Sequence, residues 1–298
     1  MAFADVIYEF IVGSDRAVVG NTAAAQADPD WCGMVDPESP VQGLLDTATV
    51  RMSKADLVEA DGASYGPSFL SGRQGTVQGA LLPSSLDLVA LANAEAKLKR
   101  ATRALRVDGI FRYTPPNDSS PRQLRFRRQD GPRVTGRRPK TFQITLESPD
   151  PYALSSSEQS VVITPGAAAG ELGVADPETD PETSALNVTA QQSVFNAGDA
   201  PTWPRFRVTG PITNPVLLNN TTGQQIVLNY ALAAGEYLDV YPQRGKVLAG
   251  GTADRYSAYQ FSTSAWWQLG AGMNDVRLLA ATYSAGASLL VAWRNAWE

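Results

Sequence analysis

The stretch WWQLGAGMNDVRL, residues 266–278, combines two adjacent tryptophans, a glycine-rich turn and an apolar run. If the tryptophans lie on a strand, their side chains point to opposite faces of the sheet. We therefore expect Trp267 to fill a core and Trp266 to face a loop or a partner. The glycines of GAGMN suit a turn because glycine adopts positive φ at little cost. A new strand is predicted to follow at 276–281.

The sequence on either side of this stretch, from residue 185 to the end, predicts an all-β domain. Short apolar runs, YQFSTSAWWQL (259–269) among them, alternate with turn signals such as NNTTG and PQRG. This spacing is typical of a β-sandwich or barrel. The same half holds five of the six tryptophans. Two interpretations of these rings stay open, a core or interface role and a sugar-binding platform.

The N-terminal half predicts an α+β domain with one main helix. The helix is expected over 86–105, with Ser84 as its N-cap, Asp87 completing a capping box and leucines at 91, 98 and 105 on one face. Residues 61–75 are expected to form turns. Strands are predicted at 6–13, 47–54, 76–83, 109–114, 123–128 and 141–148.

A segment rich in Gly, Ala, Pro, Asp and Glu separates the two halves. SPDPYALSS, residues 148–156, is expected to be the exit from the first domain. Residues 157–186 then predict a linker or a long exposed loop. Their acidic stretch ADPETDPE lacks EF-hand spacing and is a weak signal for calcium. The predicted division is a first domain at 1–155, an acidic Pro/Gly-rich linker or insert at 156–186, and a sandwich at 187–298.

Composition excludes several kinds of chemistry. The chain has no histidine and one cysteine, Cys32, so Ser-His-Asp catalysis, Cys-His catalysis and an intramolecular disulfide are excluded. There is neither a P-loop nor a dinucleotide-binding glycine motif. We expect no enzyme, no catalytic residues, no cofactor and no metal. There is no apolar run long enough to span a membrane and no basic, apolar leader at the N-terminus, so neither a membrane span nor a secretory signal is expected.

Charge is distributed unevenly along the chain. The formal net charge is −5, yet residues 97–140 contain 14 Lys or Arg and three Asp. Within them, Arg125 and Arg127 alternate with Leu124 and Phe126, which predicts one buried and one exposed face of a strand. A basic segment of this kind binds either nucleic acid or an acidic protein surface. No nucleic-acid-binding motif accompanies it, which favours an acidic neighbour.

The ordered motifs of the second half resemble those of siphophage distal tail proteins. They are NAGDAPTWPRFRVTGPITNP, NTTGQQIVLN, AGEYLDVYPQRGKVL, WWQLGAGMNDVRL and LLVAWRNAW. The first half is similar more loosely, through SGRQGTVQG before a helix and through TFQITLESPDPYALS; the acidic insert departs from the family pattern. The positions that match the family motifs and are taken as structural are Asn196, Gly198, Trp203, Pro204, Gly235, Trp267, Gly272 and Asn274.

The resemblance implies a mainly β protein with one main helix. Its first domain would be a tail-tube-like split β-barrel (α+β), and its second a galectin-like β-sandwich. Six copies would form a ring at the tail tip of a long-tailed phage, joining the tail tube to the baseplate or receptor-binding hub. The partners implied are the other five copies, the tail tube protein, the tape measure protein and the tail hub or receptor-binding proteins. The protein would be made in the host cytoplasm and reside in the virion.

In such a ring the arginines have a predicted place. A lumen lined with arginine would hold passing DNA by phosphate contacts. We therefore expect contacts with acidic residues of other chains and no stable binding of nucleic acid. The residues concerned are Arg125, Arg127, Arg133, Arg137 and Arg138, the last three in a loop predicted at 133–138. Two alternatives stay open: a carbohydrate-binding module on a ring-forming tail protein, and a major tail tube subunit.

Overall fold

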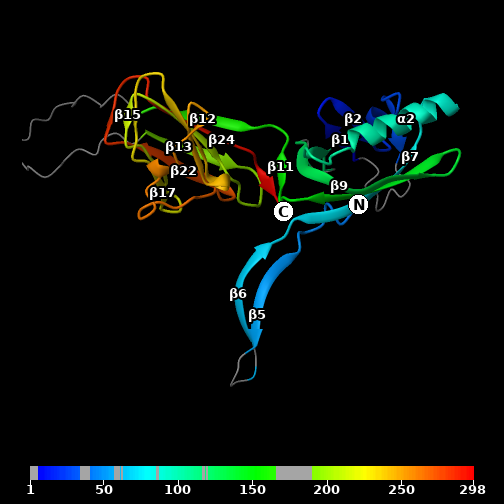
Figure 1. Ribbon diagram of the computed structural model, residues 1–298, viewed down its shortest axis with the longest axis horizontal. Coiled ribbons are helices and arrows are strands. Elements are labelled where there is room, and N and C mark those ends of the chain that lie inside the picture. The colour runs from blue at the N-terminus through cyan, green and yellow to red at the C-terminus, as the bar shows by residue number, and fades with distance from the viewer. Residues whose placement is uncertain are drawn as a thin grey trace, which may run out of the picture. The chain divides into compact units, whose positions relative to one another are not determined.

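The computed structural model describes residues 6–33, 41–56, 61, 63–84, 87–115, 118, 120–165 and 190–298. The chain divides into two compact units, Met1–Ser156 with Glu298, and Ser157–Trp297 (Figure 1). Each unit has its own hydrophobic core. Of the predicted insert, residues 166–186 lie outside the described part of the chain.

The first unit is built on a closed β-barrel of seven strands, in the order β10-β7-β3-β2-β1-β8-β9 with β9 pairing back to β10. Two short strands extend it, with β4 (Val41–Gln42) on β7 and β11 (Ala153–Ser155) on β9. The barrel strands are β1 (Tyr8–Val12), β2 (Asp15–Val19), β3 (Cys32–Gly33), β7 (Arg73–Leu81), β8 (Gly109–Tyr113), β9 (Arg122–Thr135) and β10 (Lys140–Ser148).

Aromatic rings fill the barrel because they alternate along neighbouring strands. Phe10 and Phe111 are register partners on β1 and β8, with ring centroids 5.3 Å apart, and Phe126 of β9 lies 5.9 Å from Phe10. All three are fully buried. The predicted alternation of β9 is confirmed, since Leu124 and Phe126 are buried while Arg125 is exposed.

The main helix is shorter than predicted. α2 spans Leu88–Ala101 and packs against β1, β2 and β7 (Figure 1). Its N-cap is Asp87, whose carboxylate accepts a 2.7 Å hydrogen bond from the Ala90 amide, so the prediction of Ser84 as the N-cap was wrong. An Asp side chain caps the first turn as well as Ser does. Leu105 lies beyond the helix and is 51% exposed, whereas Leu91 and Leu98 are buried as expected. A short helix, α1 (Ala23–Gln26), begins after Thr22.

A hairpin of two strands leaves the barrel between β4 and β7. Its strands are β5 (Val50–Asp56) and β6 (Ala63–Leu70), paired antiparallel, and they extend away from the barrel (Figure 1). The sequence predicted turns over 61–75, because Gly66 and Pro67 are turn residues. That prediction was wrong, because the segment pairs with β5 as a strand. Tyr65 opposes Lys54 and Ser68 opposes Met52, and a bulge between these pairs accommodates Gly66 and Pro67.

The second unit is a β-sandwich. Its six-stranded sheet has the order β12-β24-β14-β19-β20-β21, its four-stranded sheet the order β13-β22-β16-β17, and a three-stranded sheet the order β18-β15-β23. The core packs residues of the two larger sheets together. The strands are β12 (Gln159–Ile163), β13 (Ala190–Asn196), β14 (Arg205–Thr209), β15 (Ile212–Thr213), β16 (Val216–Asn219), β17 (Gln224–Val227), β18 (Ala231–Leu232), β19 (Tyr237–Tyr241), β20 (Lys246–Ala249), β21 (Ala253–Asp254), β22 (Gly272–Leu279), β23 (Thr282–Tyr283), β24 (Ser288–Trp293) and β25 (Ala296–Trp297).

The hairpin turns NNTTG, between β16 and β17, and PQRG, between β19 and β20, are confirmed. Two other expectations for this unit were wrong. Residues 259–269, read as a strand, contain only an isolated bridge at Leu269 and one at Tyr259, because the chain there closes over the edge of β17. Gln159–Ile163, assigned to the insert, form the edge strand β12, which pairs with β24 and buries Ile163. The mainly β architecture with one main helix is as predicted.

Candidate assembly site

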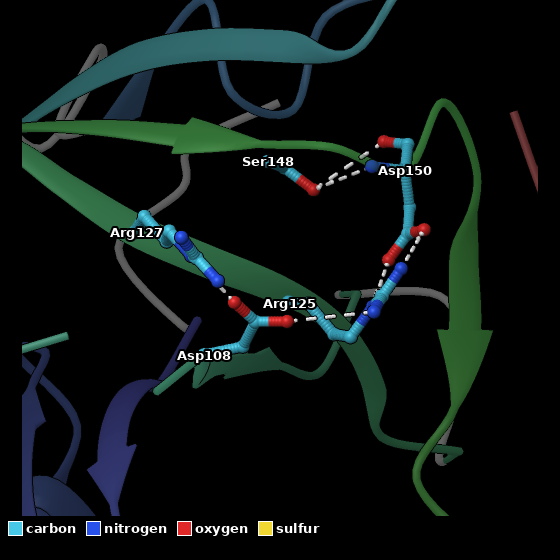
Figure 2. Close-up of polar contacts among 5 residues, drawn as sticks. All are labelled: Asp108, Arg125, Arg127, Ser148 and Asp150. Atoms are coloured by element: carbon cyan, nitrogen blue, oxygen red, sulfur yellow. Dashed lines mark hydrogen bonds and ion pairs between the residues drawn. The ribbon is translucent and has the colours of Figure 1, made fainter. Parts of the chain in front are cut away.

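The strand face that carries Arg125 and Arg127 is held by ion pairs within the chain. Arg125 binds Asp150 at two points, Nε to Oδ2 at 2.6 Å and Nη2 to Oδ1 at 2.5 Å (Figure 2). Its Nη1 lies 3.4 Å from Asp108 Oδ2, and Arg127 Nε donates to Asp108 Oδ1 at 2.7 Å. The hydrogen bond to Asp150 raises the pKa of the Arg125 guanidinium above its ordinary value.

Asp150 is itself fixed in place. Its amide donates to Ser148 Oγ and its carbonyl accepts from the same hydroxyl, both at 3.3 Å (Figure 2). The network therefore ties three segments together: the residue before β8, the middle of β9 and the turn after β10. Within the chain, Asp108 and Asp150 are the acidic partners of Arg125 and Arg127, and the two-point contact with Asp150 fits the planar fork of the Arg125 guanidinium. The expected contact of these arginines with another chain stays a prediction.

The remaining predicted arginines lie at the end of the β9–β10 hairpin. The predicted loop at 133–138 was partly wrong, because β9 continues to Thr135 and pairs with Thr141 of β10. Arg133 pairs with Asp130 at 2.5 Å, with both side chains well exposed. Arg137 and Arg138 are exposed, and among the residues that the structure describes they have no ion-pair partner. Of the five arginines predicted to contact other chains, these two are the ones without an ion pair among the described residues.

The β5–β6 hairpin exposes large apolar side chains on both of its faces. Val50 is 60% exposed and Met52 53%, and they share one face because side chains two apart point the same way. Phe69, 62% exposed, opposes Arg51 and so lies on the other face. The sequence predicted the first strand of this hairpin, at 47–54, but not the second, because residues 61–75 were expected to form turns.

The root of the hairpin is anchored by a buried arginine. Arg73, 3% exposed, donates from Nε to the Pro151 carbonyl at 2.7 Å and from Nη1 to the Asp46 carbonyl at 3.0 Å. Burial lowers its pKa from the ordinary value. A cavity of about 530 Å³ opens beside it, with Thr49 and Ser71, the residues that flank the two hairpin strands, in its wall. The hairpin thus leaves the barrel from a fixed base.

The residues that match the family motifs hold loops of the sandwich. Asn196 is fully buried: its Nδ2 donates to the Ala200 and Gly270 carbonyls, and its Oδ1 accepts from the Gly198 and Ala296 amides. A Cβ at Gly198 would lie 1.7 Å from the Ala296 carbonyl oxygen, so only glycine fits there. Asn196 therefore joins the loop after β13 to the chain before β22 and to β25.

The corner GAGMN is closed by Asn274. Its Oδ1 accepts from the Gly270 amide at 2.9 Å, and its Nδ2 donates to the Gly270 and Gly272 carbonyls. Gly272 has φ +82°, a backbone conformation that favours glycine. The corner turns the chain into β22, which begins at that glycine.

The tryptophans of the sandwich are mostly inside it. Trp267 is 1% exposed, lies 4.9 Å from the ring of Phe206 and donates from Nε1 to the Leu217 carbonyl. Trp266 is half-buried and stacks on Tyr259 at 4.2 Å, so its contact is a loop of its own chain.

The remaining motif residues lie in other parts of the sandwich. Trp203 is half-buried and the following Pro204 is buried. Gly235 lies in a turn and has φ +81°.

Groups suited to catalysis are sparse in the described residues. Within them, no cluster of three or more Cys, Asp or Glu is placed to hold a metal ion. Cys32 is buried, and burial raises the pKa of its thiol to about 12. Such a thiol stays protonated and unreactive at neutral pH. None of the helices in the described ranges is long and apolar enough to cross a membrane.

Comparison with known proteins agrees with the resemblance found in the sequence. Residues 197–297 match the family described as siphovirus-type tail component, C-terminal domain. The fold is similar to the crystal structure of the Dit protein (gp 19.1) of phage SPP1, described as a paradigm of the hub adsorption apparatus in phages that infect Gram-positive bacteria. The identity is 14%, the TM-score 0.60, and 92% of this chain and 96% of that chain are covered.

A second similar structure comes from the phage P2 baseplate in its activated conformation with calcium. The identity is 9% and the TM-score 0.47, over 96% of this chain and 97% of that chain. A comparison with curated proteins gave no significant match. The family match over residues 197–297 and the fold shared with a Dit protein confirm the predicted resemblance to siphophage distal tail proteins.

Proposed function

We propose that this chain, a siphovirus-type tail component by its C-terminal domain, closes into a homohexameric ring at the tail tip. The ring would join the tail tube to the baseplate or receptor-binding hub, with the tail tube protein and the tape measure protein as its other neighbours. The first unit would form the ring and the sandwich would be carried by it. The role is structural, not catalytic.

The observation that carries this proposal is the β5–β6 hairpin. An isolated two-stranded hairpin is marginally stable in water, and monomeric proteins rarely leave large apolar side chains exposed together. Met52 and Phe69 are both more than half exposed on opposite faces. A contact between one copy's hairpin and a different surface of the next copy would cover both faces. Repetition of such a contact closes a ring when the rotation fits.

The direct experiment is the mass of the purified full-length protein by light scattering across a range of concentrations. A ring gives six times the 31.8 kDa of one chain at high concentration. The double variant Met52→Ser/Phe69→Ser should shift the protein to monomer while its melting temperature stays close to that of the wild type. Phe195→Ser, which changes a ring that is 54% exposed on β13, is the matched control.

Two results would overturn the proposal. One is a wild-type protein that stays monomeric at every concentration and is absent as a ring from purified tails. The other is an unchanged ring in the hairpin double variant, which would place the contacts between copies elsewhere.

A further inference from the structure

Four aromatic side chains between β21 and β22 form a continuous cluster in the sandwich. Trp266 stacks on Tyr259 with centroids 4.2 Å apart and planes at 14°, and Tyr259 is parallel to Tyr256 at 6.1 Å. Phe261 meets both tyrosines edge to face, at 5.3 and 5.1 Å. The aromatic cluster is therefore Tyr256, Tyr259, Phe261 and Trp266.

The aromatic cluster has an inner and an outer part. Tyr259 is 5% exposed and packs, with Trp266, against the core of the sandwich. Phe261 is 64% exposed and Tyr256 39%. The inner rings thus hold the outer rings in place at the surface. A ligand that binds them therefore costs less conformational entropy than one that binds an aromatic ring on a free loop.

The backbone of this segment is also fixed. Gln260 donates its amide to the Val227 carbonyl at 3.0 Å, and Ala265 donates to the Gln225 carbonyl at 2.8 Å. The amide of Val227 in turn donates to Ser264 Oγ at 2.8 Å. The segment follows the edge of β17 and hydrogen-bonds to that strand. The aromatic cluster is therefore already in place before any ligand binds.

The charge around the aromatic cluster indicates the chemistry of a ligand. Residues 256–274 contain no Asp, Glu, Lys or Arg, in a chain of which 18% is charged. At one border of the segment Asp254 accepts from the Tyr256 amide at 2.8 Å, and Arg255 donates to the Asp254 carbonyl. The aromatic cluster itself is uncharged, and the two residues at its border, Asp254 and Arg255, carry opposite formal charges, so the surface has no net charge to favour an acidic ligand.

We propose that the aromatic cluster binds a neutral saccharide. The C–H face of a pyranose ring packs on the electron-rich face of an aromatic ring, and its hydroxyls hydrogen-bond to polar side chains beside the rings. Phe261 and Tyr256 supply the faces, and Asp254 and Arg255 supply hydrogen-bonding groups. The sequence suggested tryptophans as the sugar-binding surface, whereas the exposed side chains of this site are Phe261 and Tyr256. The site lies within the sandwich and does not depend on ring formation.

The test is titration of the full-length protein with three neutral hexasaccharides, cellohexaose, maltohexaose and mannohexaose, and with the acidic hexagalacturonate. We expect at least one neutral probe to bind and to change tryptophan fluorescence, because Trp266 stacks within the aromatic cluster, and hexagalacturonate to bind much more weakly. Phe261→Ala should weaken binding by about tenfold or more, since a ring face is lost. Phe195→Ala, with a similarly exposed ring on another strand, should bind as the wild type does.

Several results would overturn the inference. They are no binding of any of the three neutral hexasaccharides, equal binding of hexagalacturonate, or an equal loss in Phe261→Ala and Phe195→Ala. Loss of self-association in Phe261→Ala without any saccharide binding would identify the aromatic cluster as a protein contact instead. A melting temperature close to that of the wild type in both variants shows that the comparison is between folded proteins.

Discussion

Arg207 and Asp239 oppose each other across β14 and β19 and form a two-point ion pair. Nε lies 2.7 Å from Oδ1 and Nη2 lies 3.0 Å from Oδ2. The Asp239 side chain is only 2% exposed, and the guanidinium lies 4.3 Å above the centre of the Tyr237 ring. The hydrogen bond to Asp239 raises the pKa of Arg207 from its ordinary value. The buried carboxylate thus has its counter-charge on the neighbouring strand.

Replacement of Arg207 by Met should destabilise the sandwich strongly, because it leaves a buried carboxylate without its partner. We expect a loss of about 3 kcal/mol in the free energy of unfolding, measured by urea denaturation with tryptophan fluorescence. Arg205→Met is the matched control on the same strand, since Arg205 pairs with the exposed Glu158 at 3.4 Å. That change should cost at most about 1 kcal/mol. Equal losses in the two variants would contradict the role assigned to burial.

Gly198→Ala should destabilise the sandwich, because the new methyl group would overlap the Ala296 carbonyl oxygen. The backbone of the loop after β13 would have to move, at a cost of about 2–3 kcal/mol. Gly270→Ala is the control: its Cβ would lie 3.8 Å from Asn274 Oδ1, an ordinary contact. Thermal unfolding of both variants checks this. A Gly198→Ala protein as stable as the wild type would contradict this prediction, because it would show that the loop backbone moves at little cost in free energy.

The two groups of arginines should respond differently to charge reversal. Arg125→Glu/Arg127→Glu places new carboxylates beside Asp108 and Asp150, so it should lower the melting temperature of the first unit. Arg137→Glu/Arg138→Glu should leave that temperature nearly unchanged, because the two side chains are exposed. If these side chains contact another chain, the second variant should form fewer rings at equal concentration. Light scattering and calorimetry together separate the two effects.

A ring population equal to wild type in Arg137→Glu/Arg138→Glu would remove those two residues from the contact between copies. Salt-sensitive DNA binding by the wild type, lost in either variant, would reverse the prediction that these arginines do not bind nucleic acid.

Stability should depend on pH through Glu95 of α2. Hydrogen bonds from Lys140 of β10 at 2.6 Å and from Lys99 at 2.5 Å lower the pKa of its carboxyl below the ordinary 4.5. A lowered pKa in the folded state adds stability that is present above pH 4.5 and is lost as the pH falls through the folded-state value. Glu95→Gln should therefore be less stable than the wild type at pH 7, and the gap should narrow toward pH 3.

Urea denaturation of both proteins at pH 7, 4.5 and 3 measures that gap. Lys140→Met should reproduce part of it, because it removes the partner that contributes most. A gap of constant size across the three pH values would show that Glu95 acts through packing and not through its charge.

Local patterns in the sequence determined a good part of this protein. The alternation of Leu124 and Phe126 with arginines predicted which face of β9 is buried, because side chains on a strand alternate regardless of what they pack against. The corner before β22 and the burial of Trp267 followed from glycine conformation and ring size. The ordered motifs of the second half indicated the family, since each of them serves a local structural need, as Asn196 and Gly198 do.

Only the tertiary structure decided the features on which the proposed assembly and ligand-binding sites rest. Gly66 and Pro67 looked like turn residues until β5 supplied a strand to pair with. Arg125 and Asp150 are 25 residues apart in sequence, and only the closed barrel places their charges in contact. The aromatic cluster likewise needs the segment after β21 to fold along β17. Contacts between distant residues depend on how the whole chain packs, and no local pattern of side chains specifies which distant partner a residue meets.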